Sequence, residues 1–505
     1  NQEGFNIIYT INEGKKYNYG QIKILSNIND IDIQEIFNKL KIEEGDTYSA
    51  AKIEKSINII SNLVAEQGFP FTETVPEVER INKTNNIEVI FRINESEKKY
   101  VGKISIIGNE RTLDKVIRRN IRLAEGDAFV PSLIARSKTL IGNLGFFSNL
   151  DIQERPSTRS GYSDILVKVA ETSTGEISFG GGYSSQVGGI LNFGISEKNF
   201  LGRGQRVSIN AKLSERESDY TLNLAEPYLF NRDIYASFNL YNNAVDYKES
   251  SYDLKREGIN LTGNYTLSEF TRQSIRYGLE VRDLTPKAGA SASIIAEKGK
   301  TTLSEISTSI NVDTTNNALT PSEGYNFSLA SSYAGLGGDK DFVRVTNTGN
   351  YYQSYKDELI IFELGYDAGV IMGLSQDILI SDRFFLGGNN FRGFEQSGIG
   401  PRDTVSNDSL GGNLYYTGSL KSTFGVGLPP ELGIRGNWFT TLGSLTGIDN
   451  SSLDFKDNSS IRMSTGLGIS WNSPFGPISI ILSQALLKED YDITESVSFG
   501  LGTKF

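Results

Sequence analysis

The chain of 505 residues contains no cysteine and no histidine. These two absences exclude disulfide frameworks, metal sites built on thiolate or imidazole ligands, and catalysis by Cys/His or Ser/His/Asp groups. No apolar run approaches the roughly 20 residues that a membrane-spanning helix needs. With 50 basic residues against 61 acidic ones, the net charge of −11 argues against binding to nucleic acid. Neither a cofactor nor a metal ion is expected.

Glycine and aromatic residues, in contrast, are abundant. The chain has 52 Gly, 24 Tyr and 27 Phe, although only 38% of its residues are hydrophobic. This composition is typical of proteins with many β-strands and not of helical bundles. The length suggests about two to four domains.

The first third of the chain contains an internal repeat, in which residues 87–171 resemble residues 5–95. The segment Tyr19–Ile24, for example, returns as Val101–Ile106. Each unit is predicted to contain a strand, two helices and two further strands, which makes an α+β repeat. Apolar residues at helical spacing mark the two helices of the first unit: Ile33, Ile36, Phe37 and Leu40, then Ile53, Ile57, Ile60 and Val64.

Residues 5–13 resemble the closing strand of the repeat at 87–95, but no unit precedes them for that strand to close. We therefore expect the chain to begin inside an earlier copy; a simple N-terminal edge strand is the alternative. The expected division of the chain is the end of a truncated repeat at 1–14, complete repeats at 15–96 and 97–173, and a barrel at 174–505.

From residue 174 onward, short segments alternate between apolar and polar residues and are separated by polar turns. About sixteen such segments are found, an even number that is typical of single-chain membrane barrels. A soluble sandwich shows the same alternation, but one of this size would need about two or three domains, and no linker is found. We therefore predict an antiparallel transmembrane β-barrel of about sixteen strands. The segments lie near 177–185, 189–195, 205–213, 219–225, 233–241, 257–265, 275–281, 305–312, 325–333, 343–351, 359–369, 413–421, 432–442, 461–471, 476–486 and 495–505.

Two stretches carry more than this alternation. The first is Phe384–Phe394, which contains Phe-Arg-Gly-Phe and is soon followed by Ile399–Asp403. The second closes the chain with Gly466–Ile478 and Val497–Phe505. Together they resemble the BamA family of outer-membrane β-barrel assembly factors, and the resemblance covers the whole chain. It implies POTRA repeats in the periplasm, followed by a sixteen-stranded barrel in the outer membrane of a Gram-negative-type cell.

The resemblance also implies a role for the Phe-Arg-Gly-Phe motif. In this family the loop that carries it folds back into the barrel lumen, where carboxylates of the barrel wall hold its arginine. Arg392 would be the residue so held, Gly393 would permit close approach to the wall, and Phe391 and Phe394 would pack against it. Without the resemblance, the alternative interpretation of these residues is an ordinary glycine-rich surface loop.

The sequence departs from the family pattern at the wall carboxylates. Lys421 and Thr441 stand where acidic residues are common in the family. A lysine near Arg392 is unfavourable in a partly desolvated site. We therefore expect Glu363 or Asp367, on the lumen face of the strand before the loop, to pair with Arg392.

The last predicted strand must pair with the first, near 176–184, to close the barrel. Glycine weakens strands, so we predict a weak seam at this junction; the alternative is that the glycines only relieve crowding inside the barrel. The resemblance implies a seam that opens as a lateral gate and pairs with incoming strands. The seam glycines are Gly180, Gly181, Gly182 and Gly500. The C-terminal strand signal consists of Phe499, Leu501, Gly502 and Phe505.

The leading functional interpretation is therefore a non-enzymatic assembly factor that folds and inserts β-barrel proteins. Its expected partners are unfolded outer-membrane β-barrel precursors, accessory outer-membrane lipoproteins and the lipid bilayer, with no nucleic acid. Two alternatives stay open. One is a polypeptide secretion pore of the two-partner type, which usually carries two repeats. The other is a carboxylate-based hydrolase built on a barrel, for which the absence of histidine leaves few arrangements.

Overall fold

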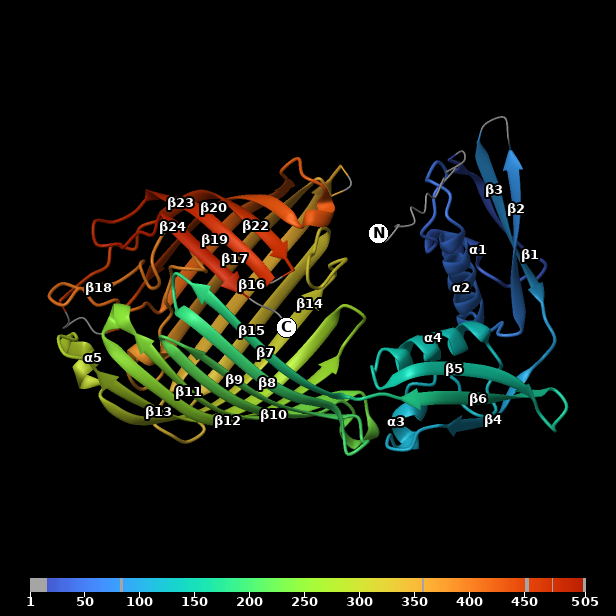
Figure 1. Ribbon diagram of the computed structural model, residues 1–505, viewed down its shortest axis with the longest axis horizontal. Coiled ribbons are helices and arrows are strands. Elements are labelled where there is room, and N and C mark those ends of the chain that lie inside the picture. The colour runs from blue at the N-terminus through green and yellow to red at the C-terminus, as the bar shows by residue number, and fades with distance from the viewer. Residues whose placement is uncertain (1–15, 82–84, 357, 450–453, 475, 503–505) are drawn as a thin grey trace, which may run out of the picture. The chain divides into compact units, whose positions relative to one another are not determined.

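The computed structural model describes residues 16–81, 85–356, 358–449, 454–474 and 476–502. Two compact units make up the chain, and the boundary between them falls after Thr174, apart from the short turn Leu201–Arg203 (Figure 1). The predicted incomplete repeat at 1–14 and the terminal residue Phe505 lie outside the described residues.

The first repeat contains β1 (Asn18–Ser26), α1 (Ile33–Asn38), α2 (Ala50–Glu66), β2 (Thr72–Ile81) and β3 (Asn86–Glu95). The sheet order is β1-β3-β2, with β1 parallel and β2 antiparallel to the central strand. The side chain of Ser49 accepts a hydrogen bond from the backbone N–H of Lys52, which fixes the start of α2. The predicted apolar stripe of α2 is buried against the sheet, and its core residues include Ile53, Ile60 and Val64.

The second repeat has the same order of elements, as the sequence predicts. It contains β4 (Tyr100–Ile107), α3 (Asp114–Arg118), α4 (Pro131–Gly142), β5 (Phe147–Pro156) and β6 (Tyr162–Glu171). Its sheet order is β4-β6-β5, which repeats the arrangement of the first sheet. None of the described helices is long and apolar enough to cross a membrane.

The second unit is a closed barrel of sixteen strands, each antiparallel to its neighbours (Figure 1). The prediction of sixteen strands is confirmed, and each observed strand overlaps one predicted segment. The strands are β7 (Gly175–Ser184), β8 (Gly188–Phe200), β9 (Gln205–Ser214), β10 (Glu217–Glu226), β11 (Ile234–Tyr247), β12 (Tyr252–Thr266), β13 (Thr271–Pro286), β14 (Gly299–Asp313), β15 (Gly324–Ala334), β16 (Phe342–Tyr355), β17 (Ile360–Gly373), β19 (Leu414–Gly425), β20 (Ile434–Thr446), β22 (Arg462–Ser473), β23 (Gly476–Leu487) and β24 (Val497–Gly502).

The outer face of the barrel is apolar, as a lipid-facing surface requires. On β17, for example, Phe362, Leu364 and Tyr366 are 42%, 61% and 44% exposed, while Glu363 and Asp367 alternate with them. The connections between strands contain the short helix α5 (Ala292–Ala296) and the two-residue strands β18 (Arg402–Asp403) and β21 (Phe455–Lys456).

Candidate functional site

The long connection between β17 and β19, residues 374–413, is here called the motif loop because it carries Phe391–Phe394. On β22 the odd-numbered Leu467 and Ile469 are exposed on the outer face, so the even-numbered Ser464 faces the lumen. The hydroxyl of Ser464 donates a hydrogen bond of 2.5 Å to the carbonyl oxygen of Arg392. The motif loop therefore folds into the barrel and contacts the inner surface of its wall.

Phe391 and Phe394 are completely buried between the loop and the wall. Their rings meet edge to face, with centroids 5.4 Å apart and an interplanar angle of 84°. Both phenylalanines therefore pack in one cluster with residues of the loop and of the barrel wall. The cluster around them contains Leu386, Ile399, Tyr415 and Leu445, with Phe384 and Ala485 packed against it.

Gly393 lies between these two aromatic residues with φ +93°, a conformation that favours glycine. A Cβ atom at this position would lie 2.8 Å from the Cβ atom of Ser464. The loop backbone thus approaches the wall more closely than a residue with a side chain allows.

We expect Gly393→Ala to destabilise the seated loop by about 1–3 kcal/mol beyond the cost of the backbone conformation, because of the contact with Ser464. Gly289→Ala is the matched control, since Gly289 has φ +85° and no atom within 4 Å of an added Cβ. The measurement is the temperature at which the folded barrel loses its compact electrophoretic mobility. Equal losses in the two variants would show that the close approach contributes nothing.

Arg392 differs from the expectation. Its guanidinium lies over the ring of Phe439, 5.5 Å from the centroid, and no described carboxylate lies within 4 Å of it. Burial lowers the pKa of Arg392, and the more distant charge of Glu363 opposes that shift.

Glu363 and Asp367, the expected partners of Arg392, have other partners in the structure. Glu363 forms an ion pair of 2.7 Å with Lys421, and Asp367 accepts a hydrogen bond of 2.6 Å from the hydroxyl of Tyr415. The physical reason is strand register, because Lys421 lies directly opposite Glu363 on the neighbouring strand. Lys421 therefore pairs with Glu363, one of the two carboxylates that were expected to pair with Arg392.

The motif loop also pairs with the connection between β23 and β24. The backbone N–H of Glu395 donates to the carbonyl oxygen of Ile493 at 3.0 Å. In return, the N–H of Ile493 donates to the carbonyl oxygen of Gly398 at 3.0 Å. The N–H of Glu495 donates to the carbonyl oxygen of Gly393 at 3.2 Å. These bonds fasten the loop to the segment that leads directly into the last strand.

A fully buried ion pair supports this connection from the wall. Arg462 at the start of β22 contacts Asp492 at 3.0 Å, and both side chains are 0% exposed. Arg462 also donates to the hydroxyl of Tyr491 at 3.1 Å. This pair was not predicted from the sequence, although Arg462, a lumen-facing arginine on an otherwise uncharged strand, was a usable signal.

The junction of β24 with β7, here called the seam, closes the barrel. In the part of the chain that the structure describes, the two strands pair at Gly500–Ser184, Leu501–Tyr183 and Gly502–Gly182. On its other side, β7 pairs with β8 from Gly175 to Ser184. Glycine occupies three of the six described positions at the seam, which leaves few side chains to pack across it.

The seam glycines are not equivalent. A Cβ atom at Gly182 would lie 2.5 Å from the carbonyl oxygen of Leu501, so glycine is needed there for close approach of the two strands. At Gly181 and Gly502 the nearest atoms are 3.6 Å and 3.7 Å from an added Cβ, which is ordinary contact. Gly180 faces Asn192 of β8, and Gly500 would approach the hydroxyl of Ser479 at 3.2 Å. Among the described residues, crowding thus accounts for glycine at position 182, and no atom crowds Gly181 or Gly502.

One end of the seam is closed by a further backbone hydrogen bond and by a side-chain contact. The backbone N–H of Ser185 donates to the carbonyl oxygen of Phe499 at 3.1 Å, and its hydroxyl donates to the carboxylate of Glu495 at 3.2 Å. Burial raises the pKa of Glu495, and the hydrogen bond from Ser185 opposes that shift. The connection that contacts the motif loop therefore also contacts the far side of the seam.

Comparison with known proteins agrees with this geometry. The chain matches the Omp85 superfamily domain over residues 199–505, and a POTRA repeat described as a surface antigen variable number repeat over residues 17–96 and 99–172. It is 31% identical over 509 residues to the outer membrane protein assembly factor BamA of Neorickettsia risticii, covering 100% of this chain and 68% of that protein. The chain belongs to the BamA family.

Solved structures show the same fold. BamA from Haemophilus ducreyi lacking POTRA domains 1–3 has a TM-score of 0.74 at 20% identity, covering 97% of this chain and 100% of that one. CdiB from Acinetobacter baumannii has a TM-score of 0.55 at 14% identity, covering 98% of this chain and 91% of that one. As a member of the BamA family, the chain is an outer-membrane protein whose POTRA repeats lie in the periplasm.

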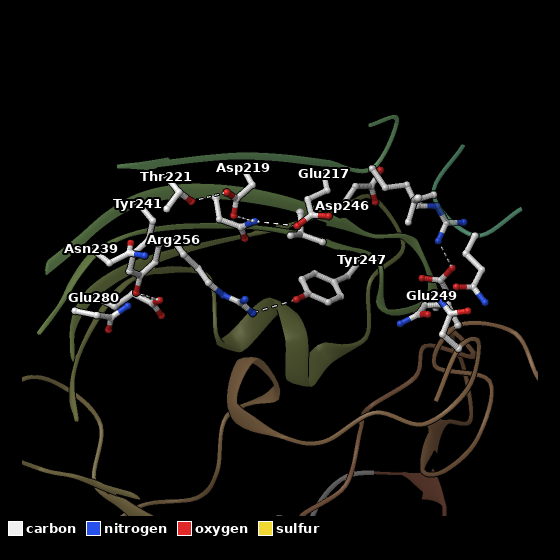
Figure 2. A pocket seen from close by; sticks show the side chains of 18 of the residues that line it. Glu217, Asp219, Thr221, Asn239, Tyr241, Asp246, Tyr247, Glu249, Arg256 and Glu280 are labelled. Carbon is white, nitrogen blue, oxygen red and sulfur yellow. Dashed lines mark hydrogen bonds and ion pairs between the residues drawn. The ribbon is translucent and has the colours of Figure 1, made fainter. Parts of the chain in front are cut away.

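The lumen also contains a polar cavity of about 640 Å³ (Figure 2). Its charged groups are engaged with one another: Arg216 pairs with Glu249 at 2.6 Å, and Tyr241 donates to Glu280 at 2.5 Å. Arg256 donates to the hydroxyl of Tyr247 at 3.0 Å. The BamA family is named for assembly and not for catalysis, and these carboxylates are bound as structural partners.

Proposed function

We propose that this protein folds and inserts β-barrel proteins into the outer membrane through the seam between β24 and β7. The observation that carries the proposal is the composition of the seam, where Gly182, Gly500 and Gly502 occupy three of the six described partner positions. Separating β24 from β7 would expose backbone donors and acceptors of β7, which an incoming strand satisfies by β-augmentation. Because glycine leaves few side chains to pack across the described part of the seam, few side-chain contacts oppose its opening.

The outer surface of β7 supports this role. Ile177 and Phe179 are 74% and 59% exposed on the outer face, so the strand is apolar on the side that meets lipid. An arriving strand would therefore pair with β7 while its own apolar side chains enter the bilayer, which avoids exposing unsatisfied backbone groups to hydrocarbon.

The repeats at 15–96 and 97–173 would receive unfolded barrel precursors and accessory outer-membrane lipoproteins before insertion at the barrel of 174–505. In the first repeat β2 is an edge strand, and Val75 and Val78 are 38% and 46% exposed on it. An edge strand with exposed apolar side chains offers both backbone pairing and hydrophobic contact to an extended segment.

The alternative is a polypeptide secretion pore. Such a pore needs an open path through the lumen, whereas the motif loop packs across the inner wall and buries Phe391 and Phe394 there. The likeness to CdiB lies at the level of the fold, and no contact of the described residues favours secretion over assembly.

The test is the folding rate of a urea-denatured outer-membrane barrel into liposomes that contain this protein or an inert barrel of similar size. We expect folding to be about tenfold faster or more with this protein, which corresponds to about 1.4 kcal/mol of barrier. Arg392→Ala, which removes the cation from the ring of Phe439, is expected to reduce the acceleration. Equal rates in both liposomes would contradict the proposal.

A further inference from the structure

Asp382 is a buried carboxylate of the motif loop that faces a set of cations on the barrel wall. It lies in a short turn at Ile380–Asp382, ahead of the Phe-Arg-Gly-Phe motif, and its side chain is 1% exposed. The three cations come from separate parts of the wall: Arg282 of β13, Lys340 of the connection between β15 and β16, and Arg344 of β16.

Asp382 contacts the wall through its carboxylate and through its backbone carbonyl oxygen. Its carboxylate forms an ion pair with Arg282, lies 3.1 Å from Nζ of Lys340, and lies 3.9 Å from the guanidinium of Arg344. Arg344 also donates a hydrogen bond of 2.8 Å to the carbonyl oxygen of Asp382. One loop residue therefore connects three positions of the wall.

Among the described residues, the wall itself offers these three cations one carboxylate within 4 Å. Arg282 has a second carboxylate, Glu280, but Lys340 has no described carboxylate other than Asp382 within 4 Å, and its side chain is 2% exposed. Burying an ammonium group without a counter-charge is strongly unfavourable. The loop carboxylate thus supplies the charge that makes burial of these cations possible.

The next residue, Arg383, joins the parts of the motif loop before and after the motif. Arg383 donates to the carbonyl oxygens of Ile378 at 3.0 Å and Leu410 at 3.1 Å, which lie before and after the motif. In the closed strand order, β13–β16 and β22–β24 occupy different sides of the barrel. The motif loop is therefore fixed at the wall of β13–β16 and reaches the connection before β24 with its motif.

We propose that Asp382 is the positioning residue that seats the motif loop in the lumen, through a charge arrangement opposite to the one expected for Arg392. The anchoring carboxylate is on the loop and the cations are on the wall. The seated loop then holds residues 393–398 against residues 493–495, which lead into β24. The effect on the loop stands by itself, and only its consequence for insertion rests on the proposed function.

The absence of native cysteine allows a single-cysteine reporter of loop seating. Ser397 lies in the paired part of the loop and is 3% exposed, so Ser397→Cys is protected from a maleimide while the loop is seated. In this background, Asp382→Asn is expected to raise the labelling rate by about 100-fold, because loss of one partner of a buried ion pair shifts a two-state equilibrium by that order or more. Asp377→Asn is the matched control, since Asp377 is an exposed carboxylate of the same loop.

Rescue distinguishes charge from shape. Adding Lys340→Met to Asp382→Asn removes the unpaired buried cation, and we expect labelling to slow by about tenfold or more relative to Asp382→Asn alone. Asp382→Glu, which keeps the charge, is expected to label more slowly than Asp382→Asn. Compact electrophoretic mobility confirms in each variant that the barrel is folded.

Labelling of Asp382→Asn at the rate of Asp377→Asn, with a folded barrel, would overturn the proposal. So would a Lys340→Met addition that leaves the rate unchanged. Because labelling is measured without any client protein, it is independent of the insertion assay. If Asp382→Asn speeds labelling but leaves assisted folding unchanged, Asp382 seats the motif loop as proposed. The same result would show that the seated loop is not needed for insertion.

Discussion

Oxidation of a Ser184→Cys/Gly500→Cys variant is expected to reduce assisted barrel folding to the rate seen with an inert barrel. The two positions are register partners across the seam and both face the lumen, so their Cβ atoms lie within reach of a disulfide. A covalent bond there prevents β24 from leaving β7. Since the chain has no native cysteine, this is the single disulfide that can form.

The control places the same bond elsewhere in the wall. Ser307 and Ser332 are register partners of β14 and β15, far from the seam in the strand order. An oxidised Ser307→Cys/Ser332→Cys variant is expected to assist folding at the unmodified rate. Reduction of the seam disulfide must restore activity, and full activity of the oxidised seam variant would contradict opening of the seam.

Asp492→Asn is expected to displace the connection before β24, because it leaves Arg462 charged and completely buried without its partner. Breaking a buried ion pair from one side costs about 3–5 kcal/mol. The same connection holds the motif loop and contacts Ser185, so we expect lower thermal stability and slower disulfide formation in the Ser184→Cys/Gly500→Cys background.

Asp490→Asn is the matched control for this prediction, since Asp490 is exposed and lies two positions away. Arg462→Gln combined with Asp492→Asn is expected to be less harmful than the sum of the two single variants, which a double-mutant cycle measures. Additive effects would mean that the ion pair does not stabilise the connection as a unit.

The strands of the barrel could be predicted because their signal is local. On β17 the alternation of Phe362, Leu364 and Tyr366 with polar or small residues is a property of neighbours in the chain, and the structure exposes these three side chains on the outer face. The two repeats could be predicted for the same reason, since helical spacing places Ile53, Ile60 and Val64 on one buried face of α2.

The charge partners could not be predicted in the same way. Arg462 and Asp492 are 30 residues apart, and Arg282 and Asp382 are 100 residues apart, so only the closed barrel and the folded loop bring them together. The expectation for Glu363 failed because the register of β17 and β19, which sets Lys421 opposite it, is a property of two strands together. The close approach of Gly182 to Leu501 likewise depends on how the first and last strands meet.

The most direct test of seam-mediated insertion is site-specific crosslinking between β7 and a client barrel arrested during assembly. Single variants Ile177→Cys, Ser178→Cys and Phe179→Cys place a thiol on alternating faces of the strand, toward lipid at the first and third positions and toward the lumen at the second. Pairing by β-augmentation predicts adducts at all three positions, with the crosslinked client residue shifting one position at each step. Adducts confined to Ser178→Cys would instead show a client passing through the lumen and would contradict insertion at the seam.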